Sequence, residues 1–314
     1  MLRTFALRLD YWLSGHAFRR AAALPEAALL QGGLRFVETA AGRIRVVDSG
    51  TPGPVILFVP DGPNVVEHYQ ALMASLSTHH RVICFDMPGF GFSLPAATYA
   101  HSLDQGAQAV LQVMNGLRIE RATLAFSCAN GFYAMRVAGL APQRVAGLVL
   151  SQTPSMEAMH AWTARVVPKP LRWPVPGQLI GWLARRKAAA SWYRIALPAG
   201  TDRKPFYLVA NHALRCGGCF SLAGVVQGLL RESGVSLKNV QTPCTVIWGA
   251  QDRSHRHTQP DSLLGLLPHA RFVRFDDCGH FPDLEQPERY ANILMNAVAG
   301  NASAGFTNAP PVAS

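Results

Sequence analysis

Short apolar runs alternate with helical patterns along most of this chain, and this alternation restricts the possible fold more than any other feature. Runs typical of buried strands cover residues 55–59, 81–86, 122–126, 145–151, 245–248 and 272–275. Helical patterns lie between them, for example at 102–117, where Ser102 and Gln105 have the spacing of a capping box. Strands that alternate with helices form a mostly parallel sheet covered on both faces, so the sequence predicts an α/β fold.

The composition indicates one large globular core. The chain has 314 residues, of which 49% are hydrophobic and 15% charged, enough for a single core with an inserted subdomain. The sequence contains no run of 18 or more apolar residues, which would predict a membrane span. The first residues lack a signal-peptide pattern. The six cysteines are scattered, which is typical of a reducing compartment. We therefore expect a cytoplasmic protein.

Three candidate chemical groups follow strands in a distinctive order. Cys128 lies between an apparent strand and an apparent helix, in the run Leu-Ala-Phe-Ser-Cys-Ala-Asn-Gly-Phe. The strand at 245–248 leads through a small-residue turn to Asp252, and the strand at 272–275 leads to a loop that carries His280. Nucleophile, acid and histidine in this order are typical of α/β-hydrolase triads. A further motif, Asp-Met-Pro-Gly-Phe-Gly-Phe-Ser, follows the strand at 81–86.

With these four motifs in order, the chain resembles the α/β-hydrolase superfamily over roughly residues 34–300. The resemblance implies that Cys128 is the nucleophile, that His280 takes its proton, and that Asp252 orients the imidazole. It further implies a thiolate–imidazolium pair as the resting state.

A second register remains open at the nucleophile. Ser127 is flanked two positions away by the small residues Ala125 and Ala129, as the small-x-nucleophile-x-small pattern requires. The spacing to the preceding strand and the following helix favours Cys128, although this places the bulky Phe126 and Asn130 at the positions that are usually small.

The resemblance also implies the domain organisation. Residues 1–33 are expected to form an N-terminal amphipathic helical segment, residues 34–152 and 241–300 the hydrolase core, 153–240 an inserted helical cap, and 301–314 a flexible tail. Tryptophans, prolines and basic residues dominate the cap region, and its aromatic side chains are candidates to roof an apolar pocket.

The expected oxyanion hole departs from the family pattern. One donor should be the backbone N–H of Ala129, the residue after the nucleophile. The second normally follows a His-Gly pair, but here the loop places Asp61 at the histidine position and Pro63, which has no N–H, at the donor position. Gly62 or Asn64 must then supply the second N–H.

The cap carries nearly all of the net charge of +10. Residues 153–240 contain twelve lysines and arginines but only three acidic residues. Such an excess favours an anionic small-molecule substrate, either free or carried on coenzyme A or on an acyl carrier protein, although a solvated basic face is the plainer interpretation. No motif accompanies the charge that would predict nucleic-acid binding.

The N-terminal segment has an apolar stripe at helical spacing: Leu2, Phe5, Leu9, Trp12 and Leu13, with arginines mostly off the stripe. A helix packed on the protein body and a peripheral membrane contact both explain this pattern.

These observations predict an enzyme that needs no cofactor or metal and hydrolyses an ester, thioester or lactone through a thioester on Cys128. The pair Cys216 and Cys219 lacks the second pair of ligands that a zinc site needs. An acyltransferase, a cyclase, a lyase and a non-catalytic ligand-binding protein of the same fold remain alternatives.

Overall fold

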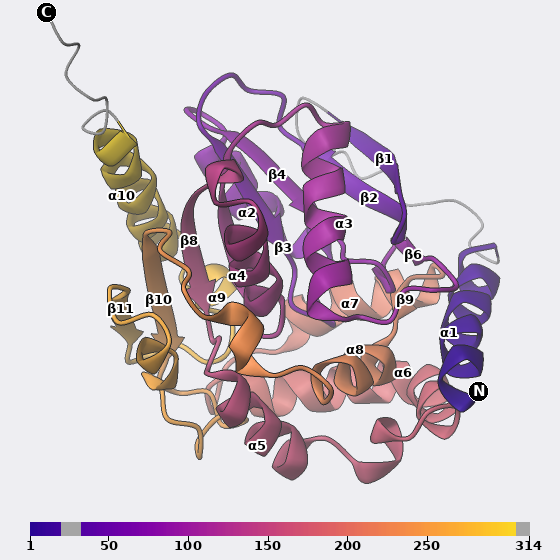
Figure 1. Ribbon diagram of the computed structural model, residues 1–314. Helices are drawn as coiled ribbons and strands as arrows, with labels where there is room; N and C mark the ends of the chain where they lie inside the picture. The colour runs from indigo at the N-terminus through magenta and orange to yellow at the C-terminus, as the bar shows by residue number, and fades with distance from the viewer. Residues whose placement is uncertain (20–32, 306–314) are drawn as a thin grey trace, which may run out of the picture.

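A computed structural model describes residues 1–19 and 33–305 and contains one large mixed sheet (Figure 1). The strand order is β1-β2-β4-β3-β7-β8-β10-β11, and β6 pairs with β2. The bounds are β1 Leu34–Thr39, β2 Gly42–Asp48, β3 Val55–Val59, β4 Arg81–Phe85, β6 Leu94–Pro95, β7 Ala122–Ser127, β8 Val145–Ser151, β10 Cys244–Gly249 and β11 Arg271–Phe275. The first two strands form an antiparallel hairpin, and the strand pairs from β4 to β11 are parallel.

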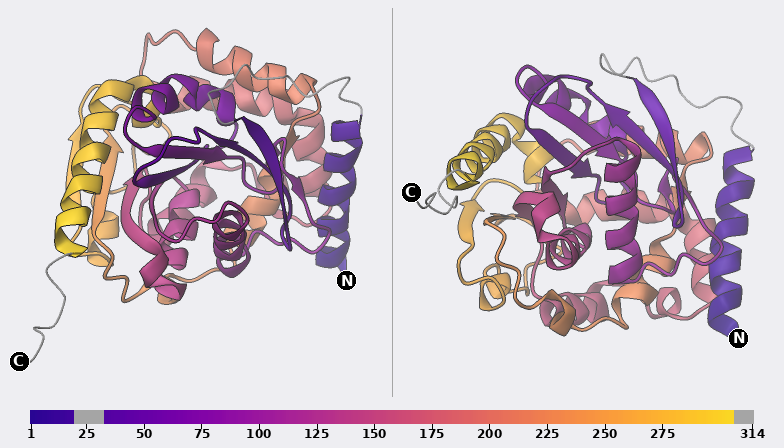
Figure 2. Two further views of the ribbon diagram at one scale, coloured as in Figure 1. Left: turned by 90° about the horizontal axis from the view of Figure 1, so that it is seen from above. Right: turned by 45° about the horizontal axis from the view of Figure 1, so that its top comes forward.

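Helices cover both faces of the sheet, as the alternation of apolar runs predicted (Figure 2). On one face, α3 (Leu103–Gly116) and α4 (Asn130–Leu140) bury side chains such as Val110 against the strands. On the other face, α2 (Gln70–Leu76) and α10 (Pro287–Gly305) bury Leu72 and Tyr290. The α/β-hydrolase fold class is therefore confirmed.

The region between β8 and β10, where the cap was expected, is mostly helical and is called the cap below. Its helices are α5 (Met156–Val166), α6 (Pro176–Ala196), α7 (Lys204–Arg215) and α8 (Leu222–Leu229). A two-stranded ribbon of β5 (Phe90–Gly91) and β9 (Cys219–Phe220) joins the cap to the loop after β4. In Figure 1 these helices lie together below the sheet. They therefore cover the loops that carry the predicted triad.

The two ends of the chain add helices to this body. Helix α1 (Leu2–Arg19) packs beside the cap, and residues 20–32 of the predicted N-terminal segment lie outside the described residues. Helix α10 continues through Gly305, so residues 301–305 are helical and not part of a loose tail; residues 306–314 lie outside the description. The short helices are α9 (Pro282–Glu285), η1 (Val66–Tyr69), η2 (Pro142–Arg144), η3 (Lys169–Arg172), η4 (Gly234–Leu237) and η5 (Ser262–Gly265). None of the described helices has the length and apolar composition to cross a bilayer.

Candidate active site

Cys128 occupies a sharp turn between β7 and α4. Its φ of 54° lies in the left-handed region, which is uncommon for a residue with a side chain and is typical of functional turns. The turn is held from both sides of the peptide chain: the Cys128 N–H donates to the Ser151 carbonyl at 2.7 Å, and Thr153 Oγ1 donates to the Cys128 carbonyl at 3.0 Å. This is the geometry of a nucleophile elbow.

The packing around the turn explains why Phe126 is tolerated. The Phe126 ring is buried in the core and meets Phe85 edge-on, with 6.2 Å between ring centroids, so it does not crowd the turn. The tight approach falls instead at Gly131, where a Cβ would lie 2.2 Å from Thr153 Oγ1. The small residue that the turn requires therefore stands three positions after Cys128.

Ser127 lies on a different side of the strand end from the candidate nucleophile. Its Oγ is buried and donates to Asp283 Oδ2 on α9 at 3.3 Å, whereas Cys128 lines the main cavity. The alternative register therefore has no geometric support in the structure.

His280 and Asp252 meet at the carboxyl ends of β11 and β10. The distance from His280 Nδ1 to Asp252 Oδ2 is 2.5 Å, and both side chains are buried. The other oxygen of Asp252 accepts from the N–H and the Oγ of Ser254 at 2.9 and 2.7 Å. Although burial works against it, the interaction with His280 lowers the pKa of Asp252 to about 2, so this carboxylate is ionised.

Gln152 braces this pair, and its role was missed in the sequence because no motif marks it. Its Nε2 donates to Asp252 Oδ2 at 2.8 Å, and its Oε1 accepts from the Gly249 N–H at 2.7 Å. Gly249 itself must be small, because a Cβ there would lie 1.8 Å from the Gly279 carbonyl oxygen. The loop of Asp252 and the loop of His280 therefore touch backbone to backbone.

Asp61, on the loop after β3, binds the opposite edge of the histidine. Its Oδ2 lies 3.0 Å from His280 Nε2, the nitrogen that would have to take the proton of the thiol. One ligand atom each of Asp61, Cys128 and His280 lies within 4.8 Å of the other two. His280 thus stands between two carboxyl groups with the thiol alongside, an arrangement that sequence analysis did not predict.

The two carboxyl groups change the protonation of the site. Burial opposes charge on His280, but Asp252 first and then Asp61 outweigh it and raise the pKa of His280 well above its usual value. Burial, followed by the neighbouring Asp61, raises the pKa of the Cys128 thiol. These two shifts favour a neutral thiol beside a protonated imidazole over the expected resting thiolate–imidazolium pair. The second carboxyl group beside His280 was not foreseen.

The oxyanion-hole candidates divide into two groups. Ala129, at the N-terminal end of α4, and Gly62 both line the cavity beside Cys128. Asn64 does not: its N–H already donates to the Asp61 carbonyl at 3.0 Å, and its Oδ1 accepts from Tyr193 at 2.7 Å. The expectation for Asn64 is therefore wrong, since its N–H is used within the loop.

A cavity of about 410 Å³ opens over Cys128 and Asp61. Its walls are mainly apolar and come from the cap helices and the loop after β4; they include Met87, Phe90, Met159, Trp162, Val166, Leu171, Trp192, Ile195, Phe220, Leu222, Val225, Val226 and Leu229. Lys187 is the one basic residue among the described lining residues, and it is exposed. The basic excess of the cap is thus mostly outside the cavity.

Two groups of side chains around His280 have the composition of metal ligands. They are Asp61, Cys128 and His280 in one, and Asp252, His255 and His280 in the other. Both groups depend on His280, whose two ring nitrogens already bond to carboxyl groups. His255 stacks on His280, and burial lowers the pKa of His255 to about 3, so it remains neutral. Acid–base chemistry accounts for Asp252 and His280, and His255 packs against them.

The fold, the elbow and the acid–histidine pair together define an α/β hydrolase. A model of the alpha/beta hydrolase family matches residues 56–293, and the chain belongs to this family.

Individual relatives cover most of this chain. A 2-hydroxymuconate semialdehyde hydrolase of Pseudomonas sp. (strain CF600) is 34% identical over 82% of this chain and 90% of that protein. Haloalkane dehalogenase 2 of Mycobacterium tuberculosis is 26% identical over 86% of this chain and 96% of that protein. Among solved structures, a thermophilic esterase from Thermogutta terrifontis superposes with a TM-score of 0.65 and 22% identity, over 85% of this chain and 98% of that one.

Proposed function

We propose that this α/β-fold hydrolase acts by acyl transfer through a thioester on Cys128. The observation that carries the proposal is the left-handed turn at Cys128, which places the thiol at the cavity within 4.8 Å of the His280 imidazole. Asp252 at 2.5 Å from Nδ1 holds the imidazole so that Nε2 faces the thiol and Asp61. A thiol so placed is a nucleophile of the kind that a histidine base can activate.

The reaction takes place in two halves. The proton on His280 Nε2 first passes to Asp61. Nε2 then accepts the thiol proton as the sulfur attacks the substrate carbonyl, and a carbon–sulfur bond forms. The bond to the leaving group then breaks, and His280 returns the proton to that group. In the second half, His280 takes a proton from water, the water oxygen attacks the thioester, and the carboxylic acid leaves as Cys128 regains its proton.

Asp61 is the proposed replacement for the missing oxyanion donor. Pro63 has no N–H, while Asp61 lines the cavity next to Gly62, where the oxygen of the attacked carbonyl would lie. Burial raises the pKa of Asp61, which favours its neutral form. A neutral carboxyl can donate one hydrogen bond to the oxyanion while its carbonyl oxygen accepts from His280.

The cavity supports an apolar acyl group as substrate. Its volume of about 410 Å³ and its aromatic and aliphatic walls suit a small acyl chain. The exposed Lys187 at the cavity and the basic cap support an anionic group on the same substrate, such as a free carboxylate, coenzyme A or an acyl carrier protein. All six cysteines are free thiols, which supports a cytoplasmic enzyme.

A second candidate reaction is the one named for the relative that is 34% identical, hydrolysis of a compound like 2-hydroxymuconate semialdehyde. The two candidate reactions use the same triad and differ in the substrate, so one panel of substrates can test both.

The proposal is tested by intact-protein mass spectrometry. The protein is incubated with p-nitrophenyl esters of increasing chain length and with the matching coenzyme A thioesters, and then quenched. Acyl mass on Cys128, with release of free acid, supports the proposal. An adduct that passes only to added amines or alcohols indicates an acyltransferase. Absence of any adduct and of any turnover across the panel and the semialdehyde contradicts the catalytic assignment and favours a ligand-binding protein.

A further inference from the structure

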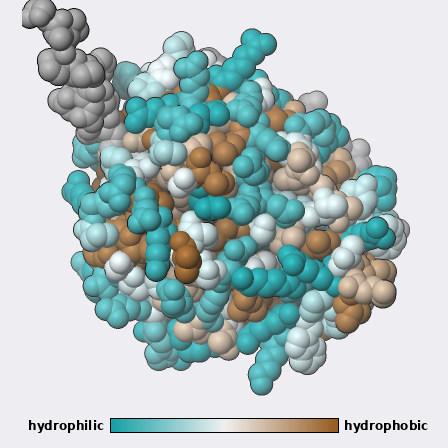
Figure 3. Space-filling model, in the orientation of Figure 1, coloured by the Kyte–Doolittle hydropathy of each residue, from teal (hydrophilic) through white to brown (hydrophobic). Residues whose placement is uncertain are grey.

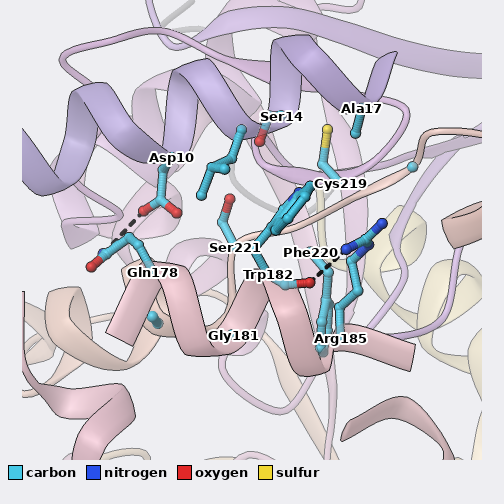
Figure 4. Close-up of a pocket in the computed structure, with 13 residues that line it drawn as sticks. Asp10, Ser14, Ala17, Gln178, Gly181, Trp182, Arg185, Cys219, Phe220 and Ser221 are labelled. Atoms are coloured by element: carbon cyan, nitrogen blue, oxygen red, sulfur yellow. Dashed lines mark hydrogen bonds between the residues drawn. The ribbon is translucent and has the colours of Figure 1, made fainter. Parts of the chain in front are cut away.

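Helix α1 is packed with its less apolar side inward. The buried residues include Ala6, Asp10, Ser14 and Ala17, which are small or polar. Asp10 Oδ2 accepts from Gln178 Nε2 on α6 at 3.2 Å, and the seam between the two helices leaves a cavity of only about 20 Å³ (Figure 4). Helix α1 is therefore firmly seated on the cap without using most of its large apolar side chains.

Those side chains form an outer stripe on α1, defined by Leu2, Phe5 and Trp12. They are 70%, 57% and 56% exposed, whereas an amphipathic helix of a soluble domain normally buries such residues. Of the stripe predicted from the sequence, only Leu13 is turned fully inward. Figure 3 shows hydrophobic side chains beside hydrophilic ones on the side of the molecule where α1 lies. A contiguous row of exposed large apolar residues indicates a binding surface.

The charges around the outer stripe have one sign. Arg3, Arg8 and Arg19 are exposed on α1, and the helix has a single acidic residue, the buried Asp10. Arg231, just beyond the end of α8, is exposed and lies close to Arg3. Partial burial of its side chain, followed by the positive charge of Arg3, lowers the pKa of Arg231. Apolar side chains bordered by arginines match a partner that has a negatively charged surface and an apolar layer beneath it.

We propose that helix α1 docks this protein onto an anionic lipid membrane, with Leu2, Phe5 and Trp12 entering the headgroup region and the arginines contacting lipid phosphates. The helix lies in the plane of the interface, because its apolar residues occupy one flank and its length of 18 residues is interrupted by charges. The adjoining cap helix α6 also exposes Leu179 and Leu183 with Arg186 at helical spacing. This surface is independent of the chemistry proposed for Cys128.

The test is flotation of the full-length protein with vesicles of phosphatidylcholine alone and of phosphatidylcholine mixed with phosphatidylglycerol. Binding is expected to the mixed vesicles and to weaken with salt, because surface potential is screened. Phe5→Ser with Trp12→Ser should weaken binding at least about tenfold. Arg3→Glu with Arg8→Glu should weaken binding to the anionic vesicles by about twentyfold or more, since each basic residue contributes about fivefold.

The matched control is Leu208→Ser with Val235→Ser, which removes two apolar side chains that are 59% and 67% exposed elsewhere on the surface. These variants should float like the parent protein, and circular dichroism should show that all variants are folded. Equal binding to both vesicle types, binding to neither, or an unchanged affinity of the Phe5/Trp12 variant would overturn the proposal. So would light scattering that shows a dimer dissolved by the Phe5/Trp12 substitutions, since the stripe would then contact a second copy.

Discussion

The two edges of the His280 ring meet two differently built regions. On the Nδ1 edge, the loop after β10 supplies Asp252, which is ionised and bonded to Ser254 and Gln152. On the Nε2 edge, the loop after β3 supplies Asp61, and burial raises the pKa of this residue. The family pattern has a histidine and an N–H donor in this loop. The acid–histidine pair on the Nδ1 edge thus has its usual form, whereas a carboxyl group stands on the Nε2 edge, where the family pattern places oxyanion donors.

This difference teaches which part of the chemistry can be exchanged. A base needs a fixed partner on its remote nitrogen, and here an ionised acid in a braced loop provides it. An oxyanion needs only a donor at the correct point, and a backbone N–H or a neutral carboxyl can serve.

Cys128→Ala should reduce turnover of the activated esters by about 10⁵-fold or more, because both regions act through the covalent intermediate. Ser127→Ala should change kcat by less than about threefold, since Ser127 bonds to Asp283 away from the cavity and the loss of one such bond is a modest perturbation. Steady-state kinetics with p-nitrophenyl esters measures both. If the Ser127 variant is the inactive one, the elbow register is wrong.

Asp252→Asn should lower kcat by about 10⁴-fold, because an amide at this place holds the imidazole in the wrong tautomer. His280→Ala should cost at least as much, and the double variant should be little slower than the worse single variant, since both residues serve one step. Pre-steady-state acylation rates measure this. Multiplicative losses would show that Asp252 and His280 serve separate functions.

Asp61→Ala should lower kcat by about 10²-fold to 10³-fold through loss of the oxyanion donor. Asp61→Asn should retain most of the kcat of the parent enzyme, because the asparagine amide can still donate a hydrogen bond to the oxyanion. Asp276→Asn, on an exposed carboxylate that pairs with Arg274, is the control and should be silent. A loss in the asparagine variant as deep as in the alanine variant would rule out the role as a donor.

Asp61→Asn should also move the pH profile. In the resting enzyme the Asp61 carboxylate raises the pKa of both His280 and Cys128, so the rate at which Cys128 reacts with iodoacetamide should rise only above neutral pH. Removal of the carboxylate lowers both pKa values, and the rise should therefore occur at lower pH. The rate of iodoacetamide alkylation of Cys128 across pH reports the same shift without any substrate. An unmoved profile would show that Asp61 does not control these protons.

The smallest expected effect concerns the cap. If its basic excess attracts an anionic substrate, kcat/KM for coenzyme A thioesters should fall a few-fold between low and physiological ionic strength, while neutral esters change little. Lys187→Glu should reproduce this fall for the anionic substrate with little effect on kcat, because attraction acts on encounter. Identical salt dependence for both substrates would show that the basic residues of the cap do not attract the substrate.

The sequence was sufficient for the fold because each buried strand is a short apolar run, and β3 and β8 have the bounds predicted for them. It also located Cys128, Asp252 and His280, since each follows a strand in a fixed order. It could not locate Gln152 or show the bond between Asp61 and His280, because these depend on side-chain directions in three dimensions. The raised pKa of Cys128 was not foreseen for the same reason.

The contact between Gly249 and Gly279 has a consequence for how this enzyme can diverge. Because the two backbones touch, no side chain can be added at Gly249 without moving the histidine loop as well. Natural or laboratory selection for new substrates therefore cannot adjust the acid and the histidine one at a time. The apolar lining residues of the cap helices lie outside this contact, so variants with altered substrate range should change there and keep the same spacing between Asp252 and His280.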